Sequence, residues 1–143
     1  MVIKIVKATL ADSQEIRKLE EKVWWKGVTS PYDAATFAEY GLTFIARDNQ
    51  KIVGAIIAIP TMKKEMRVLD WIVHPSYRRK GIGKSLYQRL FKSTKGRPLL
   101  TYVDVKNTTS LNGHHKLEFT VLKKMNHPYG RKKDHPAFLL RRE

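Results

Sequence analysis

The stretch that decides the fold runs from Val68 to Ser85 and reads VLDWIVHPSYRRKGIGKS. Strand-forming residues end at Val73, a basic turn with two glycines follows, and apolar residues then recur at helical spacing. Glycines let backbone N–H groups approach an anion, and the start of a helix adds the positive end of its dipole. This order indicates an anion-binding turn; the alternative is a basic surface loop between two elements.

The spacing of the glycines excludes two other anion-binding motifs. A P-loop ending in Lys84-Ser85 needs a glycine five residues before Gly83, where the chain has Arg78. A dinucleotide-binding motif needs a third glycine three residues after Gly83, where the chain has Leu86. Nucleotide hydrolysis and hydride transfer are therefore not expected of this turn.

The pattern that remains is Arg78-x-x-Gly81-x-Gly83, preceded by Tyr77 and by a strand that ends in Val-His-Pro. It resembles the coenzyme-A-binding signature of the GNAT family, the acetyl-CoA-dependent N-acetyltransferases. The resemblance implies acetyl-CoA as the cofactor, with Arg78 bracing the loop.

The same resemblance implies which residues contact the cofactor. The main chain that pairs with the pantetheine arm is expected at Trp71, Ile72 and Val73. The N–H groups that hold the pyrophosphate are expected at Arg79, Lys80, Gly81, Ile82, Gly83 and Lys84. Lys84 is also expected to add positive charge.

A second stretch, Asn107 to Phe119, resembles a downstream GNAT motif. Asn107 is implied as a contact to the cofactor arm, and Ser110 as the small residue of the following helix. The family's tyrosine, which protonates the departing thiolate, is replaced here by His114, and a family glycine is replaced by Glu118. An imidazolium is a competent acid near neutral pH, so His114 is a candidate catalytic acid. The alternative is an ordinary histidine on a helix surface.

The candidate for the base, or for an anchor of the amine, is Asp70, an acid in an otherwise apolar strand. The family often has its acid one position earlier, where this chain has Leu69. Asp104 is a second candidate for the base. Alternatively, Asp70 has a structural role and pairs with a Lys or Arg. A relay through water would need no side-chain base. Four aromatic residues lie where the family shapes its acceptor pocket, and they serve either that pocket or the core: Trp24, Trp25, Tyr32 and Phe37.

Length and composition limit the classes of protein to which this chain can belong. The 143 residues predict one domain, residues 1–143. The absence of cysteine excludes disulfides, thiolate metal sites and a cysteine nucleophile, and no metal is expected. No apolar run has the length of a membrane span and no secretory signal is visible, which predicts a cytoplasmic protein without a membrane partner. A monomer or a homodimer is expected.

The charge is +15, from 28 Lys and Arg against 13 Asp and Glu. Coenzyme A is a polyanion and accounts for part of this excess. The rest serves either a solvated surface or an anionic partner such as RNA, a ribosome or an acidic protein.

Hydrophobic periodicity and turn residues predict an α/β domain. Its strands are expected over residues 2–7, 42–46, 51–61, 68–73, 99–105, 119–125 and 137–140, and its helices over about 12–26, 31–40, 82–95 and 108–116. This order is similar to that of the GNAT fold. The resemblance implies a mixed, mostly antiparallel central sheet that is splayed between strands 4 and 5 and flanked by about four helices.

The sequence thus predicts an N-acetyltransferase that transfers acetyl from acetyl-CoA directly to a primary amine. Like-charge repulsion disfavours polyamines as acceptors, whereas a protein N-terminus, a lysine or an aminoacyl-RNA fits the basic surface. The alternative is a non-catalytic acyl-CoA-binding module that binds nucleic acid or an acidic protein.

Overall fold

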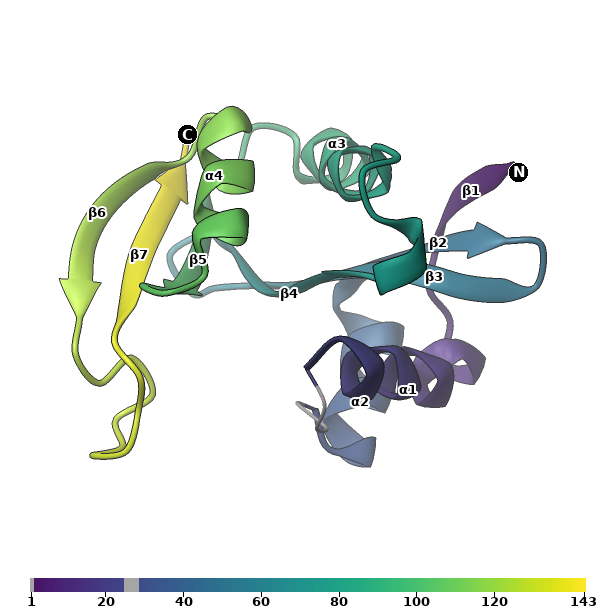
Figure 1. Ribbon diagram of the computed structural model, residues 1–143, viewed down its shortest axis with the longest axis horizontal. Helices are drawn as coiled ribbons and strands as arrows, with labels where there is room; N and C mark the ends of the chain where they lie inside the picture. The colour runs from purple at the N-terminus through teal and green to yellow at the C-terminus, as the bar shows by residue number, and fades with distance from the viewer. Residues whose placement is uncertain (1, 25–28) are drawn as a thin grey trace. The chain divides into compact units, whose positions relative to one another are not determined.

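The strand that leads into the basic turn is β4, Met66–Val73, in the computed structural model shown in Figure 1, which describes residues 2–24 and 29–143. Buried and half-buried residues alternate along all of β4. Since side chains of a strand point alternately to its two faces, Asp70 and Ile72 share the fully buried face, and Trp71 lies on the other.

The described residues form one seven-stranded sheet in the hydrogen-bonded order β1-β2-β3-β4-β5-β7-β6. The other strands are β1 Ile3–Lys7, β2 Leu42–Asp48, β3 Lys51–Pro60, β5 Leu99–Asp104, β6 Thr120–Met125 and β7 Ala137–Arg142. The β4–β5 pair is parallel, and β1–β2, β2–β3, β5–β7 and β6–β7 are antiparallel. The predicted mixed, mostly antiparallel sheet is confirmed.

The parallel pair joins the start of β4 to the start of β5, from Met66 opposite Leu99 to Val68 opposite Thr101. The splay between these two strands would begin after Val68, and it stays a prediction. The strand itself begins two residues earlier than its sequence indicated. The sequence predicted that Met66 and Arg67 belong to a polar connection, but their pairing with β5 makes them strand residues.

Four α-helices occur in the part of the chain that the structure describes: α1 Ser13–Trp24, α2 Pro31–Tyr40, α3 Ile82–Thr94 and α4 Thr108–Lys116. A capping box precedes α1, where the Asp12 carboxylate accepts hydrogen bonds from the backbone and hydroxyl of Thr9. Ser30 caps α2 by accepting from the Asp33 N–H at 3.0 Å. The predicted end of the first helix, at residues 26 and 27, lies outside the described residues. None of the described helices has the length and apolar character needed to cross a membrane.

The chain divides into two compact units. The first unit comprises Met1–Ile59 and Leu69–Lys95, and the second comprises Pro60–Val68 and Gly96–Glu143. A core of buried apolar residues fills the first unit, with members from α1, β2, β3 and β4 such as Ile16, Ile45, Ile57 and Ile72. The single domain over residues 1–143 stays a prediction.

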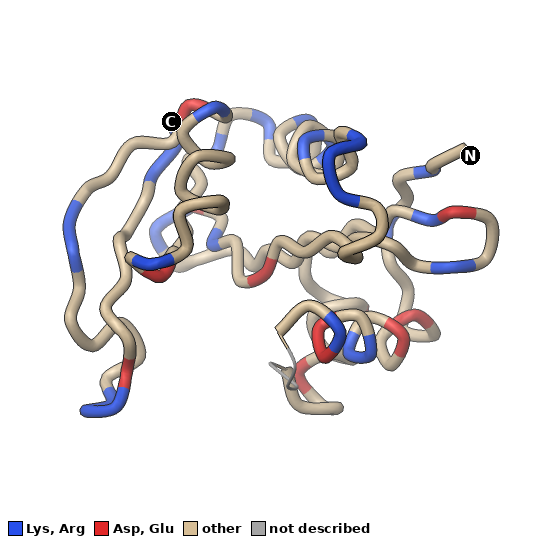
Figure 2. The backbone as a smooth tube through the Cα atoms, viewed as in Figure 1, with Lys and Arg blue, Asp and Glu red and all other residues tan. Residues whose placement is uncertain are grey.

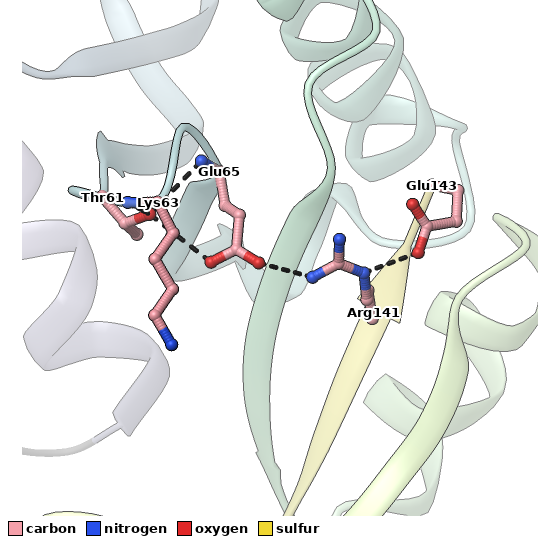
Figure 3. Close-up of polar contacts among 5 residues, drawn as sticks. All are labelled: Thr61, Lys63, Glu65, Arg141 and Glu143. Carbon is pink, nitrogen blue, oxygen red and sulfur yellow. Dashed lines mark hydrogen bonds and ion pairs between the residues drawn. The ribbon is translucent and has the colours of Figure 1, made fainter.

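An ion-pair cluster ties the β3–β4 connection of the second unit to β7 (Figure 3). The Arg141 guanidinium binds the Glu65 carboxylate and, at 2.6 Å, the Glu143 carboxylate. Glu65 is in turn held by Thr61, whose hydroxyl accepts hydrogen bonds from the Lys63 and Glu65 N–H groups. The two carboxylates raise the pKa of Arg141, so this guanidinium stays charged.

Candidate functional site

The basic turn leaves β4 through a short 3-10 helix, Pro75–Tyr77. The imidazole Nδ1 of His74 accepts the Ser76 N–H at 3.1 Å, and the Tyr77 N–H donates to the His74 carbonyl at 2.8 Å. The Arg78 guanidinium then reaches back and donates to the Val73 carbonyl at 3.3 Å. Strand end and turn are therefore joined by both backbone and side-chain hydrogen bonds.

The two glycines of the turn meet different demands. Gly81 precedes α3 with φ of +78°, a left-handed conformation that L side chains rarely adopt, and the space around it is open. At Gly83 the limit is steric, because a Cβ atom would lie 3.0 Å from the Trp71 ring. The Trp71 indole N–H also donates to the Gly83 carbonyl at 3.0 Å. Trp71 therefore fixes the first turn of α3 to β4.

The turn has the properties of an anion-binding site. Its cationic side chains, Arg78, Arg79, Lys80 and Lys84, are exposed. Among the described residues, no carboxylate lies within ion-pair distance of any of them. The N–H groups of Ile82, Gly83 and Lys84 belong to the first turn of a helix and have no acceptor within it. These residues fit a pyrophosphate group, which needs several N–H donors and positive charge.

The residues expected to pair with the pantetheine arm would do so through their backbone, and their side chains make other contacts. Ile72 is 2% exposed and belongs to the core of the first unit. Trp71 packs edge-on against the buried Tyr87, with ring centroids 4.8 Å apart. Val73 contributes its carbonyl to Arg78.

Asp70 lies beside a second buried carboxyl group, that of Glu20 on α1. Glu20 is fully buried and Asp70 is 8% exposed. Among the described residues, Oδ2 of Asp70 and Oε2 of Glu20 are buried and have no hydrogen-bond donor. The other oxygen of Glu20 accepts a short hydrogen bond from the Thr29 hydroxyl.

Burial raises the pKa of Asp70 well above its usual range, and the hydrogen bond and negative charge of Glu20 raise it further. Hydrogen bonds from the Trp24 side chain and the Trp71 backbone act in the opposite direction. Ionisation of Asp70 beside a second buried carboxyl group is unfavourable, so Asp70 favours its protonated form and can donate that proton to Glu20. We call these two residues the carboxyl pair.

Sequence reasoning missed Glu20. The signal was its place at helical spacing between Ile16 and Val23, which puts an acid within the apolar face of a helix. An ionisable side chain at such a position requires a partner, and the partner is Asp70, not a Lys or Arg.

The second predicted motif forms the start of α4 in the second unit. The Asn107 side chain caps this helix, its carbonyl oxygen accepting the Ser110 N–H at 3.1 Å. His114 is 2% exposed and packs edge-on against Phe119, with ring centroids 5.0 Å apart. His114 is therefore not on the helix surface, whereas its neighbour His115 is exposed.

The protonation of His114 follows from its surroundings. Its Nδ1 lies 2.8 Å from the Ser110 carbonyl oxygen, an atom that only accepts, so Nδ1 carries the proton. Burial lowers the pKa of the imidazole, and the Ser110 backbone opposes this in part. Near neutral pH the neutral ring with its proton on Nδ1 is favoured.

Of the remaining predicted residues, Trp24 lies beside the carboxyl pair, because its side chain hydrogen-bonds Asp70, and Asp104, Tyr32 and Phe37 have other surroundings. Asp104 ends β5, where one oxygen accepts the Lys106 N–H at 2.8 Å and the other lies 3.6 Å from His135. Tyr32 is 83% exposed, and Phe37 packs against the core of the first unit. Trp24 is 41% exposed, and Trp25 lies outside the described residues.

A cavity of about 700 Å³ in the second unit has Glu118 and Phe119 of the second predicted motif in its lining. It lies between α4 and the β6–β7 pair, with Leu111, His115 and Phe138 in its wall. No group of three or more potential metal-ligating side chains occurs in residues 2–24 and 29–143.

Fold and turn together define an α/β protein with an anion-binding turn at the start of a helix. Residues 10–119 match the family model described as the acetyltransferase (GNAT) family. The chain therefore belongs to the GNAT family, which confirms the resemblance seen in its sequence. A search of curated proteins gives no match.

Solved GNAT structures share the fold at low sequence identity. The ribosomal-protein-S18-alanine N-acetyltransferase of Escherichia coli has a TM-score of 0.84 at 19% identity, over 98% of this chain and 92% of its own. Arabidopsis thaliana NAA60 in complex with acetyl-CoA has a TM-score of 0.86 at 15% identity, over 99% of both chains. The PaiA N-acetyltransferase of Thermoplasma acidophilum, solved with coenzyme A, has a TM-score of 0.75 at 19% identity, over 100% of this chain and 99% of its own.

Proposed function

We propose that this protein is an N-acetyltransferase that moves an acetyl group from acetyl-CoA directly to a primary amine. The observation that carries the proposal is the exposed cationic turn, with its left-handed Gly81 and the start of α3. Acetyl-CoA, when bound, supplies the acetyl group as a thioester. The chain has no cysteine to take up the group first, so direct transfer is the simplest course.

The turn holds the cofactor in this proposal. N–H groups from Arg79 to Lys84 bind the pyrophosphate, and the exposed Lys84 adds charge. The backbone from Trp71 to Val73 positions the arm, and the family resemblance adds Asn107 as a contact to the arm. Trp71 keeps strand and helix in register through its hydrogen bond to Gly83.

Asp70 of the carboxyl pair is the proposed base. The nitrogen of the amine forms a bond to the acetyl carbon, the carbon–sulfur bond breaks, and the proton of the amine passes to Asp70. A base works best when its pKa lies near the working pH, and burial beside Glu20 moves the pKa of Asp70 in that direction. Glu20 acts through Asp70 and is a positioning residue.

His114 takes a different role from the one that the resemblance implied. An acid must carry its proton before the reaction, and burial of His114 favours the neutral ring. We propose that His114 stabilises the end of α4 through Ser110 and Phe119, and that the departing thiolate takes its proton from water. Turnover by His114→Asn tests this, since asparagine can keep the bond to Ser110 but cannot act as an acid.

For the acceptor we propose an amine of a protein, at the N-terminus or on a lysine, or of an aminoacyl-RNA. A charge of +15 disfavours cationic polyamines and is compatible with an anionic partner such as RNA or a ribosome. The E. coli neighbour, by its name, acts on the alanine of a ribosomal protein. A cytoplasmic site of action is part of the proposal.

A screen of acceptors tests the proposal. Purified protein and acetyl-CoA are mixed with N-terminal peptides, lysine peptides, aminoacyl-tRNA or spermidine, and release of free thiol is measured. We expect turnover on peptides or aminoacyl-tRNA that exceeds turnover on spermidine. Binding of acetyl-CoA is measured separately as a rise in melting temperature, which we expect to be lost in Gly81→Val, because valine cannot adopt φ of +78° without strain.

The matched control for Gly81→Val is Gly130→Val, a glycine of similar φ in the loop between β6 and β7. It should keep the acetyl-CoA shift of the wild type. Absence of any shift at saturating acetyl-CoA contradicts the proposal as a whole. A normal shift without thiol release on any acceptor instead supports the non-catalytic module.

A further inference from the structure

Segment 120–136, which comprises β6 and the loop that joins it to β7, carries positive charge that the cofactor site does not use. We call it the basic segment. Its charged residues are Lys123, Lys124, Arg131, Lys132, Lys133 and Asp134. The five cationic side chains are exposed and the one acid is buried. Figure 2 shows this charge on β6 and on the loop beyond it.

The loop of this segment is ordered by its buried acid. The Asp134 carboxylate accepts the N–H groups of Tyr129 and Arg131, at 2.8 and 3.1 Å, and the Arg131 side chain at 2.6 Å. Burial alone would raise the pKa of Asp134, but these hydrogen bonds together lower it, so the carboxylate stays ionised. The Lys132 and Lys133 side chains, next in the chain, form no ion pair within the described residues.

An aromatic side chain is exposed beside these charges. Tyr129 is 61% exposed, although a large apolar ring usually avoids water. Its ring lies edge-on to Tyr102 of β5 with centroids 6.0 Å apart, and the Arg131 guanidinium is 5.9 Å from its centroid. Arg67 lies 4.0 Å over the Tyr102 ring. The row thus consists of two adjacent rings with a cation at each end, and the loop holds the outer ring in a fixed place.

We propose that the basic segment is a docking surface for single-stranded RNA. Tyr129 stacks on a base, and Lys132 and Lys133 bind the phosphates beside it. Sequence-tolerant binding of single strands combines these two elements, a cationic track and an exposed aromatic ring. An acidic peptide would use the cations and has no comparable use for the ring, which decides between these partners. The inference deepens the anionic partner of the proposed function and does not depend on acetyl transfer.

The test uses the full chain without acetyl-CoA and a fluorescent oligouridine RNA of about 15 nucleotides, long enough to span one single-strand site. Affinity is measured by anisotropy at about 50 and about 200 mM salt, because phosphate contacts weaken steeply over this range. Lys132→Gln with Lys133→Gln should weaken binding at least about tenfold at the lower salt. It should also reduce the slope of log affinity against log salt by about 1.4, or about 0.7 for each phosphate contact.

Tyr129→Leu should weaken binding roughly 5- to 100-fold, the range for loss of one stacked base, without changing the salt slope. The matched control is Lys18→Gln with Lys92→Gln, the same change of charge at two exposed lysines of the first unit. It should change affinity by less than about threefold, since these lysines lie outside the basic segment. All of these sites are exposed, and equal melting temperatures establish that the variants are folded.

Two results would overturn the inference. The first is an equal loss of affinity in the control and in the Lys132/Lys133 variant, which would reflect net charge alone. The second is tight binding of a polyglutamate peptide together with no effect of Tyr129→Leu, which would identify an acidic protein partner. Because no acetyl-CoA or amine is present, failure of the acetyl-transfer proposal leaves the RNA result unaffected. Thiol release by the same variants on an active peptide reports on transfer separately.

Discussion

Asp70 and Glu20 place two carboxyl groups together in the interior of the first unit. Neither has a cation as its partner among the described residues. Ionisation of Asp70 is therefore unfavourable, and Asp70 retains its proton over a pH range in which exposed carboxyl groups have lost theirs. Stability must then depend on pH through these residues.

The sign of that dependence follows from the raised pKa of Asp70. In the folded state Asp70 keeps its proton at pH values where the unfolded chain has released it. The corresponding stabilisation is complete below the unfolded pKa and is lost as pH rises through the folded pKa. Asparagine does not titrate, so Asp70→Asn does not lose this stabilisation as pH rises. The asparagine amide can donate to Glu20 in place of the Asp70 proton.

We expect Asp70→Asn to stabilise the protein relative to wild type by on the order of 1–2 kcal/mol more at pH 8 than at pH 5. Chemical unfolding at the two pH values measures this difference. Glu21→Gln, an exposed acid next to Glu20, is the control and should show the same difference from wild type at both pH values. If Asp70→Asn also shows the same difference from wild type at both pH values, the pKa of Asp70 is not raised in the folded state.

Gly81 and Gly83 show which roles of single residues can be predicted from the sequence. The sequence predicted that both glycines serve a turn, and the positive φ of Gly81 is the conformational demand that such a turn makes. The steric demand at Gly83 comes from Trp71, twelve residues earlier, whose ring occupies the space of a Cβ atom. Glu20 and Asp70 likewise lie side by side although fifty positions separate them in the sequence. Contacts between distant residues leave no periodicity in the sequence, so the partners of Gly83 and of Asp70 were not predictable.

At the scale of elements, local signals predicted the boundaries well. The capping groups of Asp12 and Ser30 act within three residues of the backbone that they bind, so the sequence displays them directly. The start of β4 was missed because Met66 and Arg67 become strand residues only by pairing with β5, more than thirty residues later. Local chemistry therefore predicts where helices begin, and pairing decides where strands begin.

The start of α4 offers a prediction at this scale, because Asn107 has two separable roles. Its carbonyl oxygen caps the helix, and its amide N–H is the group left to contact the cofactor. Asn107→Ala should lower the free energy of unfolding by about 1 kcal/mol, the usual cost of a lost cap, and raise KM for acetyl-CoA. Asn107→Asp keeps the capping oxygen and removes the N–H donor.

Urea unfolding and thiol-release kinetics distinguish these roles. We expect Asn107→Asp to retain wild-type stability within about 0.5 kcal/mol while its KM for acetyl-CoA rises several-fold. Wild-type KM in Asn107→Asp together with raised KM in Asn107→Ala would show that only the cap matters. In that case Asn107 positions α4 and does not bind the cofactor arm.

For the molecule as a whole, the dominant property is the charge of +15. It is carried by both units: the first unit has 15 Lys and Arg against 8 Asp and Glu, and the second has 13 against 5. The differences are +7 and +8, which add to the total. The charge is therefore not explained by the cofactor turn alone, since that turn lies in the first unit. Any charged acceptor meets a repulsive or an attractive field before it reaches the site.

Salt should consequently affect acceptors of opposite charge in opposite directions. The screening length is about 10 Å at 0.1 M salt and shortens as salt is added, which weakens both repulsion and attraction. Between about 0.05 and about 0.3 M salt, we expect kcat/KM for spermidine to rise and that for a peptide with acidic residues after its N-terminus to fall, each by about 3- to 10-fold. A peptide of zero net charge is the reference, with acetyl-CoA kept saturating so that cofactor binding does not contribute. Parallel changes for all three acceptors would show that the charge of the protein does not select among acceptors, and the preference for protein amines would then have to come from the shape of the acceptor site.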